Sequence, residues 1–271
     1  ETGRRATLGY SELALGKDGT LQMYVVPHEA GFPIILDTLR GRADAIAITM
    51  TQAIIGESGV RPINPGGGPI DTANSGSGPA PEAGFVVCDS RGICRPGPDP
   101  AEGSAPPGRA IELRLTAMTG DIRQFKPFRV ESGQWLDFDS APSLAPRIVL
   151  NKEAAKGFAR HQVPARMRIA GAIADPTPQL IGVVDDGMFE PAAYVRADEL
   201  LNWMPEGKLG ALAFNGGLQM LLSPEATDVE RILRARLLAI GMTEDQIHTE
   251  PIRSRHAVEQ QLLILPWIFL G

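Results

Sequence analysis

The chain has 271 residues and a mass of 29.0 kDa, which is long enough for one large domain or two small ones with a buried core. Hydrophobic residues make up 43% of the chain and charged residues 21%, a balance that excludes wholesale disorder. The formal net charge of −6 argues against a nucleic-acid clamp, which needs a basic surface, so we expect no nucleic-acid partner.

The first regular elements form a strand–helix–strand unit. Leu21–Val26 is predicted to be a strand, Phe32–Leu39 a short helix, and Ala45–Ile55 a second strand rich in Ile, Ala and Thr. The three elements fall within about forty residues, which is typical of a split βαβ unit.

A segment rich in proline and glycine follows, because residues 62–108 hold ten of the 23 prolines and ten of the 30 glycines. Proline lacks the backbone N–H and glycine has much entropy to lose, so we expect a long surface loop, with Phe85–Val87 as a short pairing segment. The glycine triplet Gly66–Gly68 fits neither phosphate-loop spacing, and no cofactor site is predicted.

The two cysteines of the chain, Cys88 and Cys94, lie in this segment with five residues between them. That spacing is too wide for a CxxC redox motif, and two thiols alone rarely form a structural zinc site. A local disulfide, which would place the chain in an oxidising compartment, is one interpretation. Two unpaired thiols in a loop are the other.

Short strands and helices alternate in the middle of the chain. Asn151 is a good N-cap for a predicted helix at Lys152–Arg160. A second short helix is predicted at Asp198–Met204. The predicted strands of this part are Ala110–Thr116, Arg147–Leu150, Met167–Ala174, Leu180–Val184 and Ala192–Val195.

The last third repeats the strand–helix order of the first unit. Leu209–Leu222 is predicted to be a long strand or a hairpin broken at Asn215-Gly216-Gly217. Ser223 is expected to cap a helix with Pro224 at its first position, and Gly241 to end it. One apolar face of this helix is predicted to comprise Val229, Ile232, Leu233, Leu237 and Ile240. We expect the two terminal units to pack in one α+β layer, with the middle of the chain inserted between them.

The chain ends with a continuous apolar run, Leu262–Leu270, which contains Trp267. Such a run is compatible with a buried strand. It is also how a membrane helix begins at the headgroup level, and we favour a segment taken from between two membrane spans.

Residues that could carry catalysis are few. The histidines His28, His161, His248 and His256 lack the spacing of a zinc site. Two carboxylate pairs, Asp137/Asp139 and Asp185/Asp186, could act as acid and base or hold a cation, but solvated turns are the better interpretation of both. We therefore predict no catalytic and no metal-binding residues. Arg231, Arg234 and Arg236 indicate a solvated helix face or a protein-docking face.

Several segments together resemble the extracytoplasmic core domain of MacB/FtsX-like ABC transporter permeases. They are Thr119–Asp139 (TGDIRQFKPFRVESGQWLDFD), Arg147–Phe158, Met167–Ile173, Leu180–Asp186, Ala193–Val195 with Asp198–Leu201, and Leu221–Leu237. Gln134-Trp135 depart from the family pattern, which often has Arg and an aromatic residue there, and the proline- and glycine-rich loop is unusually long.

The resemblance implies an α+β fold with two lobes. A porter-like lobe would comprise residues 1–58 and 209–253, and an inserted β-rich lobe residues 110–208. The loop with Cys88 and Cys94 would be 59–109, and 254–271 would lead into a membrane span.

The resemblance also implies a function without catalysis, on the extracytoplasmic (periplasmic) face of the bacterial plasma membrane. The domain would pass ATP-driven motion of membrane helices to the outside, with the membrane at both chain ends. Implied partners are a cytoplasmic ATP-binding subunit that does not touch this segment, a symmetry-related or paired permease, and an adaptor or lipoprotein. The alternatives are a secreted or periplasmic hydrolase that uses an Asp pair and a module that binds a small molecule or a lipoprotein.

Overall fold

The structure is a computed structural model of the chain. It describes residues 19–26, 28, 30–70, 105–169, 171–204 and 218–252, together with the backbone of 85–88 and 94–97. The hairpin predicted around Asn215-Gly216-Gly217, the apolar run Leu262–Leu270 and segment 254–271 lie outside the described residues.

One mixed sheet dominates the described part of the chain, in the order β12-β1-β11-β2-β5-β10-β7-β9-β6, with β8 added beside β2. Its strands are β1 (Leu21–Val25), β2 (Ala45–Gly56), β5 (Ala110–Met118), β6 (Arg129–Gly133), β7 (Arg147–Asn151), β8 (Met167–Ile169), β9 (Gln179–Asp185), β10 (Ala192–Arg196), β11 (Leu218–Leu222) and β12 (Ile247–Pro251). A separate pair, β3 (Phe85–Cys88) and β4 (Cys94–Gly97), forms a second small sheet.

Four α-helices and three short 3-10 helices accompany the described strands. The α-helices are α2 (Gly31–Leu39), α4 (Lys152–His161), α5 (Ala197–Leu201) and α7 (Thr227–Ala239). The 3-10 helices are η1 (Pro65–Gly67), η2 (Ile122–Gln124) and η4 (Glu244–Gln246). Together with the large sheet they confirm the predicted α+β class.

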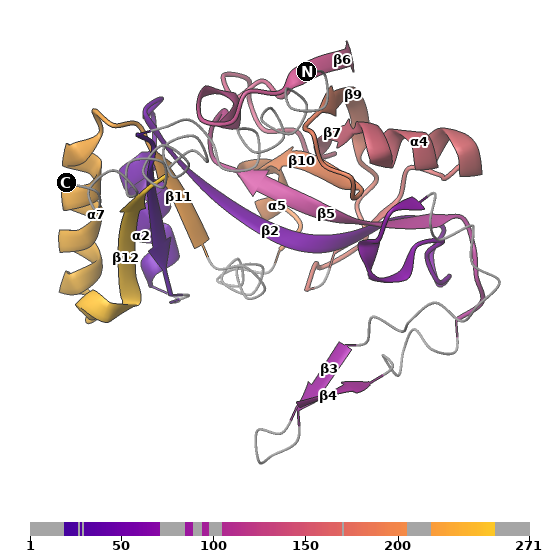
Figure 1. Ribbon diagram of the computed structural model, residues 1–271, viewed down its shortest axis with the longest axis horizontal. Coiled ribbons are helices and arrows are strands. Elements are labelled where there is room, and N and C mark those ends of the chain that lie inside the picture. Colours follow the sequence, from indigo (N-terminus) through magenta and orange to yellow (C-terminus); the bar gives the residue numbers. More distant parts are fainter. Residues whose placement is uncertain are drawn as a thin grey trace, which may run out of the picture.

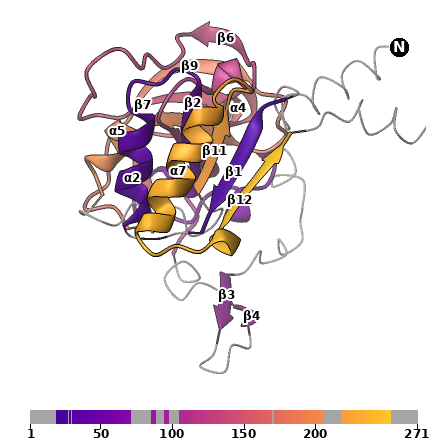
Figure 2. The same ribbon diagram turned by 90° about the vertical axis from the view of Figure 1, so that its left-hand side faces the viewer.

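The two terminal units interleave in the sheet. Strand β11 pairs antiparallel with β1 on one side and with β2 on the other, so a strand from the end of the chain lies between two strands from its beginning. Helices α2 and α7 lie side by side over this part of the sheet, as Figure 2 shows. The expectation that both terminal units pack in one layer is therefore confirmed.

The inserted strands continue the same sheet on the far side of β2. Strand β5 pairs antiparallel with β2 over nine residue pairs, and β10, β7, β9 and β6 follow it (Figure 1). The pairs β5–β10 and β7–β9 are parallel and the others antiparallel. The strands assigned to the porter-like lobe thus form one end of a continuous sheet, and those of the inserted lobe the other. The domain boundaries themselves stay a prediction.

The four α-helices of the described residues cover one face of the sheet. In β2 the residues Ala45 and Ala47 pack against the core under α2 and α7, whereas Ala53 and Ile55 pack against the core next to α4 and α5. These four positions are odd-numbered, so they share a face. The even-numbered residues Ile46 and Ile48 face the other side, where Phe125, which precedes β6, and Trp135, which follows it, cover the sheet.

Two expectations about α7 are wrong. The helix begins at Thr227 rather than after Ser223, because the Ser223 carbonyl accepts a hydrogen bond from the Ala226 N–H at 2.9 Å and residues 223–226 form a separate turn. Ile232 is 40% exposed, so the buried stripe is narrower than predicted and comprises Val229, Leu233 and Leu237. Gly241 does end the helix region, at φ +95°.

The predicted strand Met167–Ala174 is shorter in the structure, where β8 ends at Ile169. Gly171 has φ +80°, which turns the chain, and the Ile173 N–H donates to the carbonyl of Trp203 at 2.7 Å instead of to a strand. The cap of α4 is confirmed, since the Asn151 side chain accepts from the Ala154 N–H at 2.9 Å.

Candidate functional site

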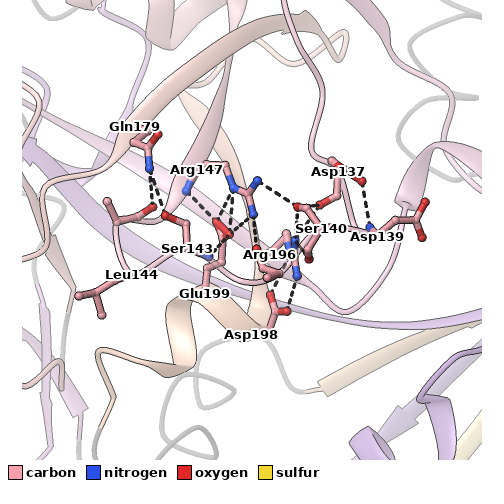
Figure 3. Close-up of polar contacts among 12 residues, drawn as sticks. Asp137, Asp139, Ser140, Ser143, Leu144, Arg147, Gln179, Arg196, Asp198 and Glu199 are labelled. Atoms are coloured by element: carbon pink, nitrogen blue, oxygen red, sulfur yellow. Dashed lines mark hydrogen bonds and ion pairs between the residues drawn. The ribbon is translucent and has the colours of Figure 1, made fainter.

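A buried ion pair anchors the loop between β6 and β7. Glu199 of α5 is fully buried, and its carboxylate accepts from the Arg147 guanidinium, with Oε2 2.8 Å from Nη2 (Figure 3). The same carboxylate accepts from the backbone N–H groups of Arg147 at 3.0 Å and Ser143 at 3.2 Å. Burial alone would raise the pKa of Glu199, but these hydrogen bonds outweigh it and lower the pKa. Glu199 is therefore ionised and holds the loop to the end of the sheet.

A buried arginine, Arg196, holds the other side of this loop. The Arg196 side chain is 4% exposed and pairs with Asp198 at 2.5 Å. It also donates to the carbonyl oxygens of Asp137 at 2.7 Å and Ser140 at 2.8 Å, as Figure 3 shows. A guanidinium suits this position because it offers several donors in one plane. The two arginines act as positioning groups for the loop backbone.

The first predicted carboxylate pair, Asp137 and Asp139, lies on this loop, and both residues are exposed. The Asp137 side chain accepts from the Asp139 N–H at 2.9 Å, which closes a local turn. The turn interpretation is confirmed for this pair, and the side chains do not form an acid–base couple.

The two residues of the second pair, Asp185 and Asp186, have different surroundings. Asp185 accepts from the Gly187 N–H at 3.1 Å, as a turn residue does. Asp186 is 4% exposed and accepts from the Tyr194 hydroxyl at 2.7 Å and from the Met188 N–H at 3.0 Å. Burial raises the pKa of Asp186 although these hydrogen bonds oppose the shift. Sequence reasoning identified the turn and missed the burial.

Asn151 links this carboxylate to its surroundings. Its amide donates to the carbonyl of Glu190 at 2.8 Å and to Asp186 at 3.3 Å, and its oxygen accepts from Ala192 at 3.0 Å as well as capping α4. The network joins β7, α4 and the β9–β10 turn with hydrogen bonds, and it contains no cation.

We expect Asp186→Asn to flatten the pH dependence of stability. A carboxyl whose folded pKa is raised contributes stability that is complete below its unfolded pKa of about 4 and is lost as the pH rises through the folded value. Asparagine removes that loss, so the free energy of unfolding of the variant should exceed that of the parent chain near neutral pH. Urea titrations from acid to neutral pH measure the difference. Asp185→Asn is the control, and an Asp186→Asn variant whose stability relative to the parent chain does not rise with pH would contradict the prediction.

The histidines do not converge. His28 accepts from the Ala30 N–H at 3.2 Å, His248 lies 3.3 Å from Glu250, and the buried Nε2 of His161 has no hydrogen-bond partner. Among the residues that the structure describes, no group of three or more His, Cys, Asp or Glu could hold a metal ion. His256 lies outside those residues.

The basic residues of α7 are mostly paired. Arg234 lies 2.7 Å from Glu244, and Arg236 lies 2.9 Å from Asp37 of α2. Arg231 is exposed. The solvated-face interpretation therefore suits Arg231 best, whereas Arg236 ties the two helices together.

No family model matches the chain, and no curated protein does. Three solved structures are similar to it. The periplasmic region of MacB from Actinobacillus actinomycetemcomitans has 12% identity and a TM-score of 0.46, covering 90% of this chain and 92% of that one. The extracellular domain of the noncanonic ABC-type transporter YknZ from Gram-positive bacteria has 10% identity and a TM-score of 0.43, covering 86% and 100%. A domain of a permease protein from Porphyromonas gingivalis has 14% identity and a TM-score of 0.42, covering 87% and 90%.

One of these structures is the periplasmic region of MacB, the protein after which the resembled family is named. The recognition made from the sequence names the same kind of domain as these three structures. Within the described ranges, no helix is both long enough and apolar enough to span a bilayer.

Proposed function

We propose that the chain is the extracytoplasmic domain of an ABC transporter permease of the MacB/FtsX-like type. In this role it passes movements of membrane helices to a partner outside the membrane and has no catalysis of its own. The proposal is supported by the sequence resemblance. One structural observation carries it: the first and the last described residues of the large sheet lie next to each other.

These residues meet at one end of the β1–β12 pair. The two strands run antiparallel with Leu21 opposite Pro251, and the Ile252 N–H donates to the Thr20 carbonyl at 2.8 Å. Figure 2 shows the two strands side by side at one edge of the sheet. A domain whose ends meet in this way can be attached to one membrane at both ends, which the resemblance requires.

A continuous sheet connects β1 and β12 to the inserted strands. Strands β2 and β5 pair without interruption from Ile48 opposite Met118 to Gly56 opposite Ala110. They join the strands nearest the chain ends to the inserted strands (Figure 1). Because every one of these pairs belongs to a ladder with a buried face, a displacement applied near β1 and β12 would move the inserted strands with it.

The partners of the proposed domain follow from this role. A cytoplasmic ATP-binding subunit would supply the motion without touching this segment, and a paired permease with an adaptor or lipoprotein would receive it. The hydrolase alternative is not favoured by the geometry, since Asp137 and Asp139 form an exposed turn and Asp186 is bonded to Tyr194.

The proposal is tested on the full natural gene product in cells, with Cys88, Cys94 and any further cysteine replaced by serine. Lys156→Cys on α4 and Ile232→Cys on α7 present exposed thiols, since the Lys156 side chain is 62% and Ile232 40% exposed. A membrane-impermeant maleimide should label both in intact spheroplasts. Protection until lysis would contradict the extracytoplasmic location.

The transmission of motion is measured with spin labels on the same two sites. The distance between Lys156→Cys and Ile232→Cys within one domain should stay constant between the nucleotide-free and ATP-bound transporter, because one sheet connects them. The distance between the Lys156 labels of two paired copies should change. A nucleotide-dependent change within the domain, or none between copies, would contradict the proposed role.

We also expect Cys88 and Cys94 to form a disulfide. The structure places their backbones directly opposite each other in the β3–β4 pair, and opposite residues of an antiparallel pair lie close enough for the bond where the geometry permits. Their side chains lie outside what the structure describes. Maleimide should label no thiol in the chain isolated from the periplasm and both after reduction. Full labelling without reductant would show two free thiols.

A further inference from the structure

Leu144 lies in the loop between β6 and β7, and the backbone on both sides of it is fixed. The Ser143 N–H donates to the Glu199 carboxylate at 3.2 Å. The Ala145 carbonyl accepts from the Gln179 amide at 3.1 Å. Leu144 itself is 70% exposed, and Figure 3 shows its side chain pointing away from the Glu199 carboxylate. The hydrogen bonds therefore hold a large apolar side chain in water at a defined position.

Two further apolar residues meet Leu144 through direct hydrogen bonds. The Trp203 indole N–H donates to the Leu144 carbonyl at 2.7 Å, and the Trp203 carbonyl accepts from the Ile173 N–H at 2.7 Å. Ile173 is 69% exposed and Trp203 is half-buried. We call Leu144, Ile173 and Trp203 the apolar patch. A single exposed apolar residue is common on a protein surface, whereas several held together in this way are typical of an interaction site.

The segments that form the apolar patch carry acidic residues and no basic ones. Residues 137–146, 171–180 and 197–204 contain five Asp or Glu and no Lys or Arg. Four of the five are exposed, namely Asp137, Asp139, Asp175 and Asp198. Among these, Asp139 and Asp175 form no ion pair with a residue that the structure describes. The patch is therefore apolar in its centre and negatively charged at its rim, as a protein-binding surface often combines an apolar centre with a polar rim.

The charge of the rim selects the kind of molecule that can cover the patch. An anionic membrane surface would be repelled, and so would a second copy of the chain, which carries a net charge of −6. A protein segment with apolar residues flanked by lysine or arginine matches both the centre and the rim.

We propose that the apolar patch is the docking site for such a segment of a different protein. Leu144 is the anchor that enters the partner, because it is the most exposed residue of the patch and its backbone is already ordered before binding. The carboxylates at the rim attract the basic residues of the segment. The inference gives the chemistry of the partner in the proposed function, and it rests on that function for the partner's place outside the membrane.

The test measures the binding of two synthetic amphipathic peptides to the 271-residue chain by fluorescence anisotropy. One peptide is built from leucine and lysine, and the other has glutamate in place of every lysine. The lysine peptide should bind, more weakly as salt is added, and the glutamate peptide should not. Leu144→Ser should weaken binding by about tenfold or more, the loss expected for a central apolar anchor. Ile232→Ser, which replaces a 40% exposed isoleucine on α7, is the matched control and should leave binding unchanged.

A third variant tests the rim. Asp139→Asn combined with Asp175→Asn should lower the affinity for the lysine peptide at low salt and reduce its salt dependence. All these substitutions lie at exposed positions, so the variants should melt at the temperature of the parent chain, which separates a loss of binding from a loss of folding.

Four results would overturn the proposal. They are no binding of the lysine peptide, equal binding of both peptides, equal affinity of Leu144→Ser and Ile232→Ser, and binding of phosphatidylglycerol vesicles that Leu144→Ser abolishes, which would identify a membrane as the occupant. The peptide experiment is independent of the maleimide labelling in spheroplasts. Failure of the labelling alone would overturn the proposed function and leave the docking site in place.

Discussion

Replacing Glu199 with alanine lowers the free energy of unfolding by about 3 kcal/mol or more, because a fully buried acceptor is lost and the Arg147 guanidinium, 21% exposed, and two backbone N–H groups keep no partner there. Arg147 would lose its counter-charge, and the N–H groups of Ser143 and Arg147 would lose their acceptor. Chemical denaturation of the chain measures the change as a lower midpoint with an unchanged slope.

Two variants control this experiment. Glu250→Gln removes a 53% exposed carboxylate from β12 and should change stability by no more than about 0.5 kcal/mol. The double variant Glu199→Leu with Arg147→Met removes both charges and should recover much of the loss, because the cost of an unpaired buried charge disappears. A Glu199→Ala variant as stable as Glu250→Gln would show that the pair does not anchor the loop.

Gly56→Ala should lower the free energy of unfolding by at least about 3 kcal/mol, since it combines backbone strain with a steric clash. Gly56 ends β2 at φ +146°, a conformation that L-residues rarely adopt. A Cβ at this position would lie 2.3 Å from the carbonyl oxygen of Arg109 and 2.4 Å from the Cα of Ala110. Both atoms belong to the backbone beside β2, so they cannot withdraw without opening the β2–β5 ladder.

Gly59→Ala is the matched control for this prediction. Gly59 has φ +72°, but no heavy atom lies within 4 Å of the position of its Cβ. The substitution therefore costs only the left-handed conformation, about 1–2 kcal/mol. If both variants lost the same stability, the close approach of β2 and β5 at Gly56 would not matter to the fold.

Local sequence signals were sufficient for most of the regular elements. Alternating apolar residues placed β5, the cap Asn151 placed α4, and the strand–helix order at both ends of the chain indicated that the terminal units pack together. These signals work because the side-chain period and the capping chemistry belong to neighbouring residues.

The sequence-based predictions were wrong or incomplete where the structure depends on an interaction that the local residue pattern does not reveal. Ser223 and Pro224 have the composition of a helix start, but the backbone bond from Ala226 to Ser223 closes a turn first. The strands β6 and β12 were not predicted, because their burial patterns are largely exposed and they depend on their partners β9 and β1.

The polar groups that hold the molecule together were outside the reach of sequence reasoning. Glu199 lies in a short run, Ala197–Leu201, that reads as an ordinary short helix, and nothing local pairs it with Arg147, which is 52 residues away. Asp186 reads as a turn residue beside Asp185, yet only Asp186 is buried. The residues around a charged side chain do not indicate which distant residue it will pair with. These networks therefore could not be predicted from the neighbouring sequence.

Composition, periodicity and capping determined by themselves that this is an α+β protein with paired strand–helix units at its two ends, because those properties depend on residues close in the chain. Only the tertiary structure decided that β11 enters between β1 and β2, that Thr20 meets Ile252, and that Glu199 pairs with Arg147. Each of these facts joins residues that are distant in sequence, and such contacts are selected by the packing of the whole sheet.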